Sequence, residues 1–425
     1  MIKIIKYSGQ SAKFMFGERD EICGNVEDKV KEIIAEVRKN GDGALKRYSE
    51  KFDGFVCDDF EVKAEEFEEA FKEIDGKLIQ TIKNSVDNIK LFHSKQLRSG
   101  FEINCGDRVV GQKFTPVESA GIYVPGGTAA YPSTVLMNAV PAKIAGVKNL
   151  IMATPVKADG KVRAEVLVAA ALCGVDRIFK MGGAQAIAAM AYGTESVPKV
   201  DVITGPGRDY VATAKKLVYG VACSIDMIAG PSEILIIADK NANARFVAAD
   251  LLSQAEHDKI ASAILLTDCE DLANEVVLEL KSQLDSLSRK EIARMSLDAN
   301  CRIILTDNLE QAVKLSNEYA PEHLELAVKE PFKLLDSVKN AGSVFLGYNT
   351  PEAVGDYYAG ANHTLPTSGT AKYASPLSVD DFMKSTQYVY YTQSALAGAA
   401  DDIISFAEAE GLGAHANSIY VRVKK

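Results

Sequence analysis

Apolar and polar residues change their spacing along the chain, and this change separates a helical first part from a longer alternating part. From about Val26 to Ser99, apolar residues recur every three or four positions between lysines and glutamates. This period predicts helices with one solvated face. Residues 101–116 alternate in the manner of extended chain and lead into the glycine-rich stretch GIYVPGGTAAYP.

From Ser133 onward, short apolar runs alternate with helical periods. The expected strands are LIMATP, RIFKMGG, VDVITGP, EILIIAD, SAILLTD, CRIILTD and SVFLG, and the expected helices include AQAIAAMAYG, DYVATAKKLVYG, ARFVAADLLSQAEHD and LEQAVKLSNEYA. Such alternation is typical of parallel sheets covered by helices on both faces. We therefore predict an α/β fold of two doubly wound, incomplete Rossmann-like domains in tandem, with small helical elements at both ends.

The tail from about Val379 is predicted to be a small separate element. It contains a helix, SALAGAADDIISFAEAEG, followed by a short basic strand, SIYVRVKK. An element of this kind is suited to contact with a neighbouring subunit.

Length and composition narrow the possible partners. The chain has 425 residues, more than the roughly 250–300 that one hydrophobic core usually supports, so we expect two large domains. With 47% hydrophobic and 25% charged residues, the composition is that of a soluble globular protein. A formal charge of −10 argues against nucleic acid or an anionic membrane as partner. Small molecules are the expected ligands.

Targeting signals and cysteine spacing indicate a cytoplasmic protein. The start, MIKIIKYSGQ, lacks the apolar core of a signal peptide, and no apolar run approaches the ~18 residues of a membrane-spanning helix. Seven cysteines are scattered singly without a C-x-x-C pair, which favours reduced, mostly buried thiols. None is a candidate nucleophile or metal ligand.

Glycine-rich turns are the only local hint of a nucleotide. The fingerprint G-x-G-x-x-G is absent, and the nearest strings are GPGRDY after VDVIT and GGAQA after FKM. Such turns can present backbone N–H groups to a phosphate at a helix N-terminus. Ordinary turn geometry is the more common reason for glycine at such positions, so spacing alone does not predict NAD.

Only five histidines are present, which makes their surroundings informative. His93 lies in the long charged helix and is expected to be solvated. In DLLSQAEHD, Gln254 and His257 stand three residues apart and share a helix face, beside Asp258. Imidazole next to amide or carboxylate oxygens suits zinc, whereas an exposed polar helix face is the simpler alternative.

Further candidates follow in the C-terminal half. In NEYAPEHLEL, Pro321 is predicted to begin a helical turn that carries Glu322 and His323. A first-turn histidine tends to stay neutral, as a general base requires, although surface capping is an alternative role. The long polar segment YNTPEAVGDYYAGANHTLPTSG presents Asp356 and His363 and is typical of a functional loop. Near the end, AEAEGLGAH contains the remaining pair, Glu410 and His415.

At these residues the chain resembles the histidinol dehydrogenase family over nearly its whole length. The most specific stretch is IDMIAGPSEILIIADKNANARFVAADLLSQAEHD, residues 225–258. Further matches are GIYVPGGTAAYPSTVLMNAVPAKIAGV, MGGAQAIAAMAYGT, EYAPEHLEL, GANHTLPT and EAEGLGAH. Several motifs in the same order make coincidence implausible.

The resemblance implies roles for individual residues. It implies one zinc per subunit, with ligands Gln254, His257 and Asp356 from one subunit and His415 from its partner in a homodimer. Glu322 and His323 would be the proton-transfer pair. The residues implied to contact L-histidinol are Ser232, Gln254, His257, His323, Asp356, Glu410 and His415. The residues implied to contact NAD are Tyr123, Gln185 and Arg208.

Arg208 departs from the family pattern. Where the family reads GPGN, this chain reads GPGR. An arginine can reach a phosphate or ribose oxygen instead of making the amide contact, so the choice between NAD and NADP is less certain.

The implied reaction is the last step of histidine biosynthesis, a zinc-dependent, four-electron oxidation of L-histidinol to L-histidine through bound histidinaldehyde with two NAD. Two alternatives are open: a paralogous NAD-dependent dehydrogenase of another small amino or sulfonated alcohol, and a non-catalytic two-domain binding protein.

The expected domain boundaries are an extension at 1–20, a first α/β domain at 21–117 with 233–375, a second at 118–232, and a tail domain at 376–425 that reaches the dimer partner.

Overall fold

The structure is a computed structural model that describes residues 2, 4–17, 26–54, 59–126, 130–157 and 159–423. The chain divides into two compact units. Unit 1 comprises Met1–Gln96 and Glu118–Phe382, and unit 2 comprises Leu97–Val117 and Met383–Lys425. Unit 1 contains both parallel sheets, and each unit is described by itself.

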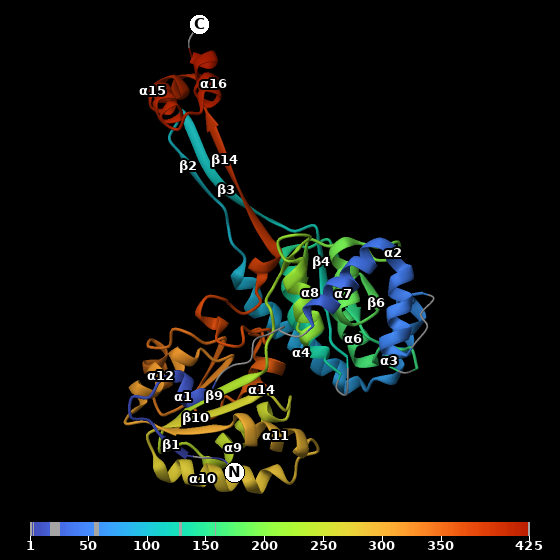
Figure 1. Ribbon diagram of the computed structural model, residues 1–425, viewed down its shortest axis with the longest axis vertical. Coiled ribbons are helices and arrows are strands. Elements are labelled where there is room, and N and C mark those ends of the chain that lie inside the picture. Colours follow the sequence, from blue (N-terminus) through green and yellow to red (C-terminus); the bar gives the residue numbers. More distant parts are fainter. Residues whose placement is uncertain are drawn as a thin grey trace. The chain divides into compact units, whose positions relative to one another are not determined.

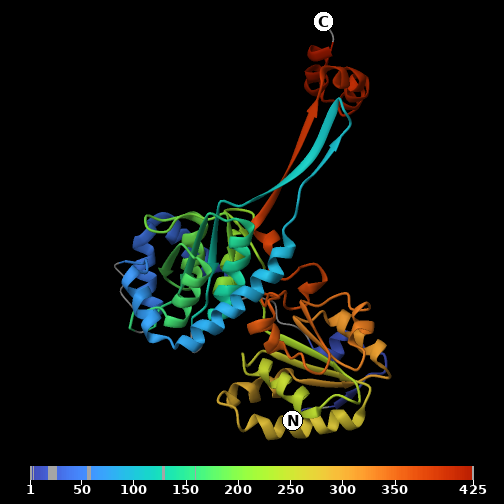
Figure 2. The same cartoon turned by 180° about the vertical axis from the view of Figure 1, so that it is seen from behind.

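The first sheet of unit 1 has six parallel strands in the order β1-β11-β10-β9-β12-β13 (Figures 1 and 2). These are β1 (Ile4–Lys6), β9 (Glu233–Ala238), β10 (Ser262–Thr267), β11 (Arg302–Leu305), β12 (His323–Ala327) and β13 (Ser343–Leu346). One face packs against α9 (Ala244–Ala255), α10 (Glu270–Leu284) and α11 (Lys290–Asn300). The other face packs against α1 (Ala12–Phe16), α12 (Leu309–Tyr319) and α13 (Pro331–Leu335). Because both faces are covered, the central strands are apolar along nearly their whole length.

The second sheet of unit 1 has five parallel strands in the order β6-β5-β4-β7-β8. These are β4 (Ser119–Tyr123), β5 (Asn149–Thr154), β6 (Arg177–Lys180), β7 (Val202–Thr204) and β8 (Ser224–Ile225). The helices between them are α5 (Pro132–Ala145), α6 (Ala164–Cys173), α7 (Gly183–Tyr192) and α8 (Asp209–Val218). Two parallel sheets in tandem confirm the predicted fold class.

The N-terminal helices belong structurally to the five-stranded sheet. They are α2 (Glu27–Asp53), α3 (Ala64–Glu73) and α4 (Gly76–His93). Apolar side chains of α2 join α7 and α8 in one core, while α3 packs on α6. The sequence-based boundaries had grouped these helices with residues 233–375 instead. The amphipathic pattern shows that a helix has an apolar face but does not show which sheet that face covers.

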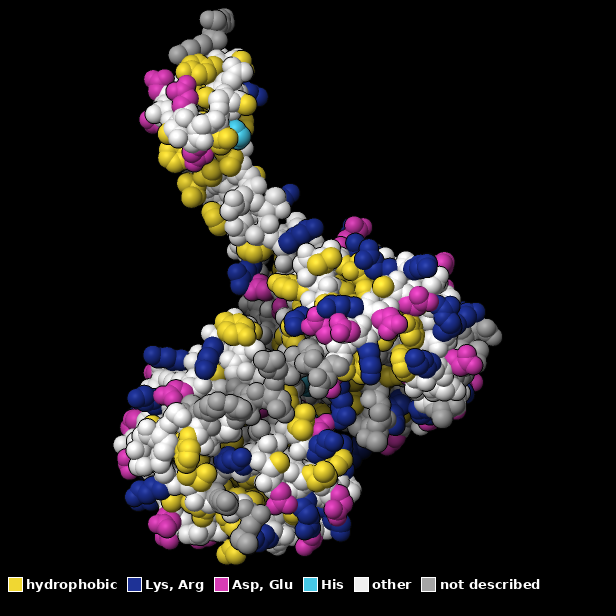
Figure 3. Space-filling view, in the orientation of Figure 1, with side chains coloured by type: hydrophobic (Ala, Val, Ile, Leu, Met, Phe, Trp, Pro, Cys, Tyr) yellow, Lys and Arg dark blue, Asp and Glu magenta, His cyan; other side chains and the backbone are white. Residues whose placement is uncertain are grey.

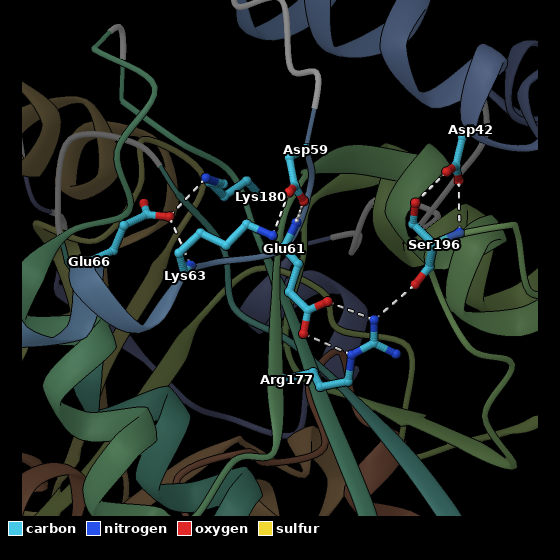
Figure 4. Close-up of polar contacts among 8 residues, drawn as sticks. All are labelled: Asp42, Asp59, Glu61, Lys63, Glu66, Arg177, Lys180 and Ser196. Atoms are coloured by element: carbon cyan, nitrogen blue, oxygen red, sulfur yellow. Dashed lines mark hydrogen bonds and ion pairs between the residues drawn. The ribbon is translucent and has the colours of Figure 1, made fainter.

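Polar contacts fasten the N-terminal segment to the same sheet (Figure 4). The Glu61 carboxylate accepts two hydrogen bonds from Arg177, from Nε at 2.9 Å and from Nη2 at 2.7 Å. Lys180 donates to Glu66 of α3 at 2.9 Å. Since Arg177 and Lys180 are the end residues of β6, the segment is held along one edge strand.

Unit 2 is a three-stranded antiparallel sheet with a helical pair (Figure 1). Its elements are β2 (Phe101–Asn104), β3 (Arg108–Pro116), β14 (Met383–Tyr391), α15 (Gln393–Ala409) and α16 (Gly413–Val423). Most side chains of β2 and β14 are exposed, and hydrophobic side chains gather on this unit in Figure 3. The basic strand predicted for SIYVRVKK is wrong, because the described part forms α16 and packs its apolar side on α15.

The segment around Pro321 corrects a local prediction. The helical turn predicted at Pro321 is wrong, since HLELA forms β12 between β9 and β13.

The thiols of Cys173, Cys223 and Cys301 are buried, as expected. Cys105 is exposed, Cys269 is partly buried, and the remaining two cysteines lie outside the described residues. No helix among the described residues is long and apolar enough to cross a membrane.

The turn after β7 is a point of close backbone contact. Gly205 has φ +112°, and a Cβ added there would lie 2.1 Å from the carbonyl oxygen of Tyr123. Its N–H donates to Asp226 at 2.8 Å, and its carbonyl accepts from the buried Lys215 at 2.8 Å. The turn therefore has no room for a side chain at Gly205.

We expect Gly205→Ala to lower the free energy of unfolding by about 2 kcal/mol or more, because strained φ and a backbone clash add together. Gly220→Ala is the matched control, with φ +69° and no atom within 4 Å of the added Cβ. It should cost only the left-handed strain, about 1 kcal/mol. Urea denaturation of both variants measures the difference, and equal losses would contradict the assignment of a clash.

Candidate active site

A buried polar group lies at the amino ends of β9 and β12. His323 begins β12 and Glu233 begins β9, with Ser232 directly before it. The Glu322 carboxylate accepts a hydrogen bond from the Glu233 N–H at 2.8 Å. Glu322 and His323 are 8% and 4% exposed. Parallel pairing of β9 with β12 thus brings residues ninety positions apart into contact.

The His323 ring is surrounded by polar atoms. Its Nδ1 lies 3.0 Å from Gln254 Nε2, 3.1 Å from the carbonyl oxygen of Glu233 and 3.6 Å from the Glu322 carboxylate. Its Nε2 lies 3.8 Å from carboxylate oxygens of both Glu352 and Asp356. A neutral ring with its proton on Nδ1 donates to Glu233 and leaves an Nε2 lone pair facing the carboxylates. This tautomer is a competent general base.

Burial shifts the pKa values of these groups toward their neutral forms. It lowers the pKa of His323 and of His257. It raises the pKa of Glu322 well above its ordinary value, with the neighbouring carboxyls Glu233 and Glu352 adding to the effect. It also raises the pKa of Asp356 to about 7, helped by the charge of Glu352. Without a cation, the site therefore favours neutral imidazoles and protonated carboxyls.

The donor atoms fit a divalent cation. Gln254 is fully buried, and its Oε1 has no hydrogen-bond partner, like Nε2 of His323. One ligand atom each from His323, Glu352 and Asp356 lie within 4.8 Å of one another. Of the ligands expected from the family, Asp356 belongs to this group. A cation would compensate the buried carboxylates, and imidazole nitrogen with amide and carboxylate oxygen suits zinc.

His93 is more buried than its sequence context indicated. The solvated His93 expected from the charged helix is wrong: its side chain is fully buried, with Nδ1 2.7 Å from Gln96 Oε1 and Nε2 3.4 Å from Asn362. Burial lowers the pKa of His363 to about 4, and the charges of His323 and His257 act in the same direction. His363 therefore lies in the electrostatic field of the site.

Residues expected to contact NAD lie near the switch point of the five-stranded sheet. The chain runs from β4 to β5 on one side and returns to β7 on the other, so the carboxyl ends of β4 and β7 form this point. Tyr123 ends β4, and its hydroxyl accepts from the N–H of Gly183, the first residue of α7. Gln185 is buried in the same helix. Both residues thus lie at or next to the start of a helix that follows a parallel strand.

Arg208 lies in the turn after β7, at the same switch point, but its side chain is exposed and paired with another residue. It is the N-cap of α8, its side chain is 86% exposed, and its guanidinium forms an ion pair with Asp258. Asp258 follows His257 directly, so the ion pair connects the GPGR turn to the end of α9. An exposed ion pair of this kind contributes little to stability.

The polar side chains around His323 lie at an unusual edge of their sheet. Doubly wound sheets generally bind ligands at the carboxyl ends of their strands, whereas His323 and Glu233 stand at the amino ends of theirs. The end of α9 brings Gln254 to this edge, since a helix between parallel strands returns to where the next strand starts. Glu410 and His415 belong to unit 2, so their approach to this group stays a prediction.

Sequence reasoning missed a second set of buried carboxyls beside the site. Glu325 lies on β12 two residues after His323, Asp250 lies one helical turn before Gln254, and Glu352 begins α14 (Glu352–Val354). Glu325 and Glu352 are 4% and 3% exposed. The missed signal was the alternation in HLELA, which puts His323 and Glu325 on one strand face.

Comparison with known proteins identifies the family. A model of the histidinol dehydrogenase family matches residues 18–423. The chain belongs to the histidinol dehydrogenase family. It is 52% identical over 396 residues to histidinol dehydrogenase of Clostridium acetobutylicum, covering 93% of this chain and 92% of the relative. It is 54% identical over 402 residues to that of Streptococcus mutans, covering 94% and 93%.

A solved structure of the same family has the same fold. The crystal structure of histidinol dehydrogenase from Elizabethkingia anophelis superposes with a TM-score of 0.95 at 38% identity, covering 99% of this chain and 98% of that chain. The predicted family is confirmed. Family membership makes the chain an oxidoreductase of histidine biosynthesis.

The buried carboxyls predict a pH-dependent stability. Burial raises the pKa of Asp250 to about 6, so the folded state holds a proton that the unfolded chain releases near pH 4. This contribution is present at low pH and is lost as pH rises from about 4 through 6. Asp250→Asn does not titrate, so its stability relative to the wild type should rise by up to about 3 kcal/mol between pH 4 and pH 7.

Guanidinium denaturation of the metal-free protein at several pH values measures this change. A difference between wild type and Asp250→Asn that stays constant across the range would show that the carboxyl titrates normally in the folded protein.

Proposed function

We propose that this chain oxidises L-histidinol to L-histidine in two steps, each reducing one NAD. Support comes from membership of a family whose relatives carry that name and from the buried pair of His323 and Glu322 beside the unpartnered amide oxygen of Gln254. The His323 geometry carries the proposal: a ring held at Nδ1 with a free, buried Nε2 is built to take a proton.

Zinc is the proposed metal, one per subunit. Gln254, His257 and Asp356 would hold it together with His415 of a second copy of the chain. When bound, it supplies a positive charge that orients the amino and imidazole groups of the substrate. The buried Oε1 of Gln254 has no hydrogen-bond partner, so this oxygen is available as a ligand.

His323 is proposed as the base of the first oxidation. Its Nε2 takes the hydroxyl proton while a hydride leaves the carbinol carbon for NAD, and the product is the bound aldehyde. Burial keeps the ring neutral before the step, because burial lowers its pKa. The Nδ1–H bond to the Glu233 carbonyl fixes the orientation of the ring during the transfer.

Glu322 is proposed to assist the addition of water to the aldehyde. Its carboxylate lies 3.6 Å from His323 Nδ1 and is anchored by the Glu233 N–H. Burial raises the pKa of Glu322, so its carboxylate is a stronger base than that of an exposed glutamate. Ser232 and Glu410 would complete the substrate contacts, and the enclosed position of the site would retain the aldehyde.

NAD would bind at the switch point of the five-stranded sheet through Tyr123, Gln185 and Arg208. When bound, it accepts the hydride in each step. Tyr123 and the start of α7 hold their positions through the Tyr123–Gly183 hydrogen bond. Arg208 would have to leave Asp258 to contact the cofactor, so we infer that it adds less specificity than the other two residues.

A homodimer is proposed because unit 2 exposes several large apolar side chains that a second subunit would cover. The exposed fractions are 72% for Phe406, 68% for Val389 and 66% for Val421. Unit 2 also carries Glu410 and His415, so dimerisation through it would allow each copy to complete the other's site.

Removing zinc with a strong chelator is expected to abolish histidinol-dependent NADH formation, and adding zinc should restore it. His323→Ala should retain zinc but lose activity by about 10²–10⁴-fold, since a general base contributes that much. NADH absorbance and metal content by atomic absorption provide the two readouts. Full activity of the metal-free protein would contradict the zinc assignment, and fewer than two NADH per histidinol would contradict the four-electron reaction.

Sharing of sites between subunits is tested by mixing two inactive variants, His257→Ala and His415→Ala. Refolded mixtures should regain about a quarter of wild-type activity, because half of the dimers are mixed and each has one intact site. Each variant refolded alone is the control. A mixture that forms heterodimers yet stays inactive would show that His415 serves its own subunit.

A further inference from the structure

Lys215 and Asp226 form a buried ion pair beside the five-stranded sheet. The side chains of both residues are 1% exposed. By comparison, the side chains of the pair Lys143 and Asp176 in the same sheet are 30% and 44% exposed. Removing two charges from water costs free energy that their mutual attraction often does not recover, and apolar side chains of similar volume would pack equally well. A fully buried pair at this place therefore needs a reason other than packing.

The two side chains hold both backbone polar groups of Gly205. Lys215 Nζ donates to the Gly205 carbonyl oxygen at 2.8 Å, and Asp226 Oδ2 accepts from the Gly205 N–H at 2.8 Å. Asp226 Oδ1 pairs with Lys215 Nζ and also accepts from the N–H of Met227 at 2.6 Å. The ammonium group and both carboxylate oxygens are therefore engaged with the main chain or with each other.

These contacts begin where the strand ladder ends. β7 ends at Thr204 and β8 ends at Ile225, so Gly205 and Asp226 are the first residues past the two strands. The φ of +112° at Gly205 turns its N–H and carbonyl groups away from strand geometry. Side chains of a helix lean toward its N-terminus, so Lys215 can extend its stem along α8 toward the turn.

The turn that the pair holds joins two of the residues proposed to contact NAD. Gly205 opens the turn GPGR, which ends at Arg208, the N-cap of α8. The backbone of Gly205 also lies against the end of β4, since a Cβ added there would be 2.1 Å from the carbonyl oxygen of Tyr123. Fixing Gly205 therefore fixes the turn against Tyr123.

The same turn offers polar groups that fit a dinucleotide. The side chain of Arg208 makes no capping hydrogen bond to α8, so the first N–H groups of this helix can face a phosphate. The Thr204 hydroxyl at the end of β7 is fully buried and has no hydrogen-bond partner among the described residues. Both features lie next to Gly205 in the chain.

We propose that Lys215 and Asp226 are positioning residues for NAD, which hold the GPGR turn in the conformation that binds the cofactor. The proposal rests on the proposed function. Both side chains are buried and act through the backbone of Gly205, so neither needs to touch the cofactor. Because the pair holds the turn before NAD arrives, binding does not have to order it, and this pre-organisation strengthens binding.

The test removes both charges together in the double variant Lys215→Met/Asp226→Asn, so that no unpaired charge stays in the core. Methionine retains most of the lysine stem but has no donor for the Gly205 carbonyl. We expect the Kd for NADH, measured by isothermal titration calorimetry, and the KM for NAD to rise about 10-fold, as for loss of one hydrogen bond to a charged group. The kcat at saturating NAD and the KM for histidinol should stay within about twofold of wild type, because cofactor binding alone is weakened.

Lys143→Met/Asp176→Asn is the matched control. Lys143 Nζ donates to Asp176 Oδ2 at 2.9 Å, and the same oxygen accepts from the N–H of Leu150 at 2.7 Å. This pair also holds a backbone group of the five-stranded sheet, but at the amino ends of β5 and β6. Its loss should leave the Kd for NADH at the wild-type value, even where it lowers stability.

A second variant keeps the test decisive if the double variant fails to fold, as judged by circular dichroism. Asp226→Asn alone retains Lys215 and an amide oxygen for the Gly205 N–H, but it removes the charge that holds the ammonium group in place. The same rise in the Kd for NADH is expected, with kcat near the wild-type value.

The outcomes separate positioning from stability and from the reaction itself. A wild-type Kd for NADH and KM for NAD in the folded variant would overturn the positioning role while leaving the proposed function intact. A fall in kcat without a rise in the Kd for NADH, or an equal rise in the control variant, would also overturn it and assign a structural role. A wild-type protein that neither binds NADH nor reduces NAD with histidinol would instead overturn the proposed function.

Discussion

The parallel pairing of β12 with β9 is the constraint on which the site depends. It places His323 opposite Ile234 and brings the Glu233 backbone within hydrogen-bonding distance of both His323 and Glu322. Backbone hydrogen bonds of a buried sheet are expensive to break, since water cannot replace them. Glu322 and His323 are therefore fixed by main-chain groups that have little freedom to move.

Burial then decides the chemistry of these side chains. The same low-dielectric surroundings lower the pKa of His323 and raise the pKa values of Glu322, Glu352 and Asp356. Burial thus favours the neutral form of each group, the unprotonated imidazole and the protonated carboxyls. A bound cation would relieve part of the cost of burying several carboxyls together.

The two sheets place their candidate site residues at opposite ends of the strands. In the five-stranded sheet, Tyr123 and the GPGR turn lie at the carboxyl ends of strands, where doubly wound folds usually bind ligands. In the six-stranded sheet the histidine group lies at the amino ends instead. This edge receives the C-terminal end of α9, which supplies Gln254, and so collects side chains from a helix as well as from strands.

The sequence by itself determined the alternation of strands and helices, the fold class and the family, because these depend on local periodicity and on ordered motifs. It also singled out Gln254, His257, Asp356 and the pair Glu322 and His323. Only the tertiary structure decided that HLELA is a strand: its apolar residues fit either period, and the choice was made by pairing with β9 and β13. Likewise, only the packing of β12 against α9 joined Glu325 to Asp250, since a contact across seventy-five residues leaves no mark on local spacing.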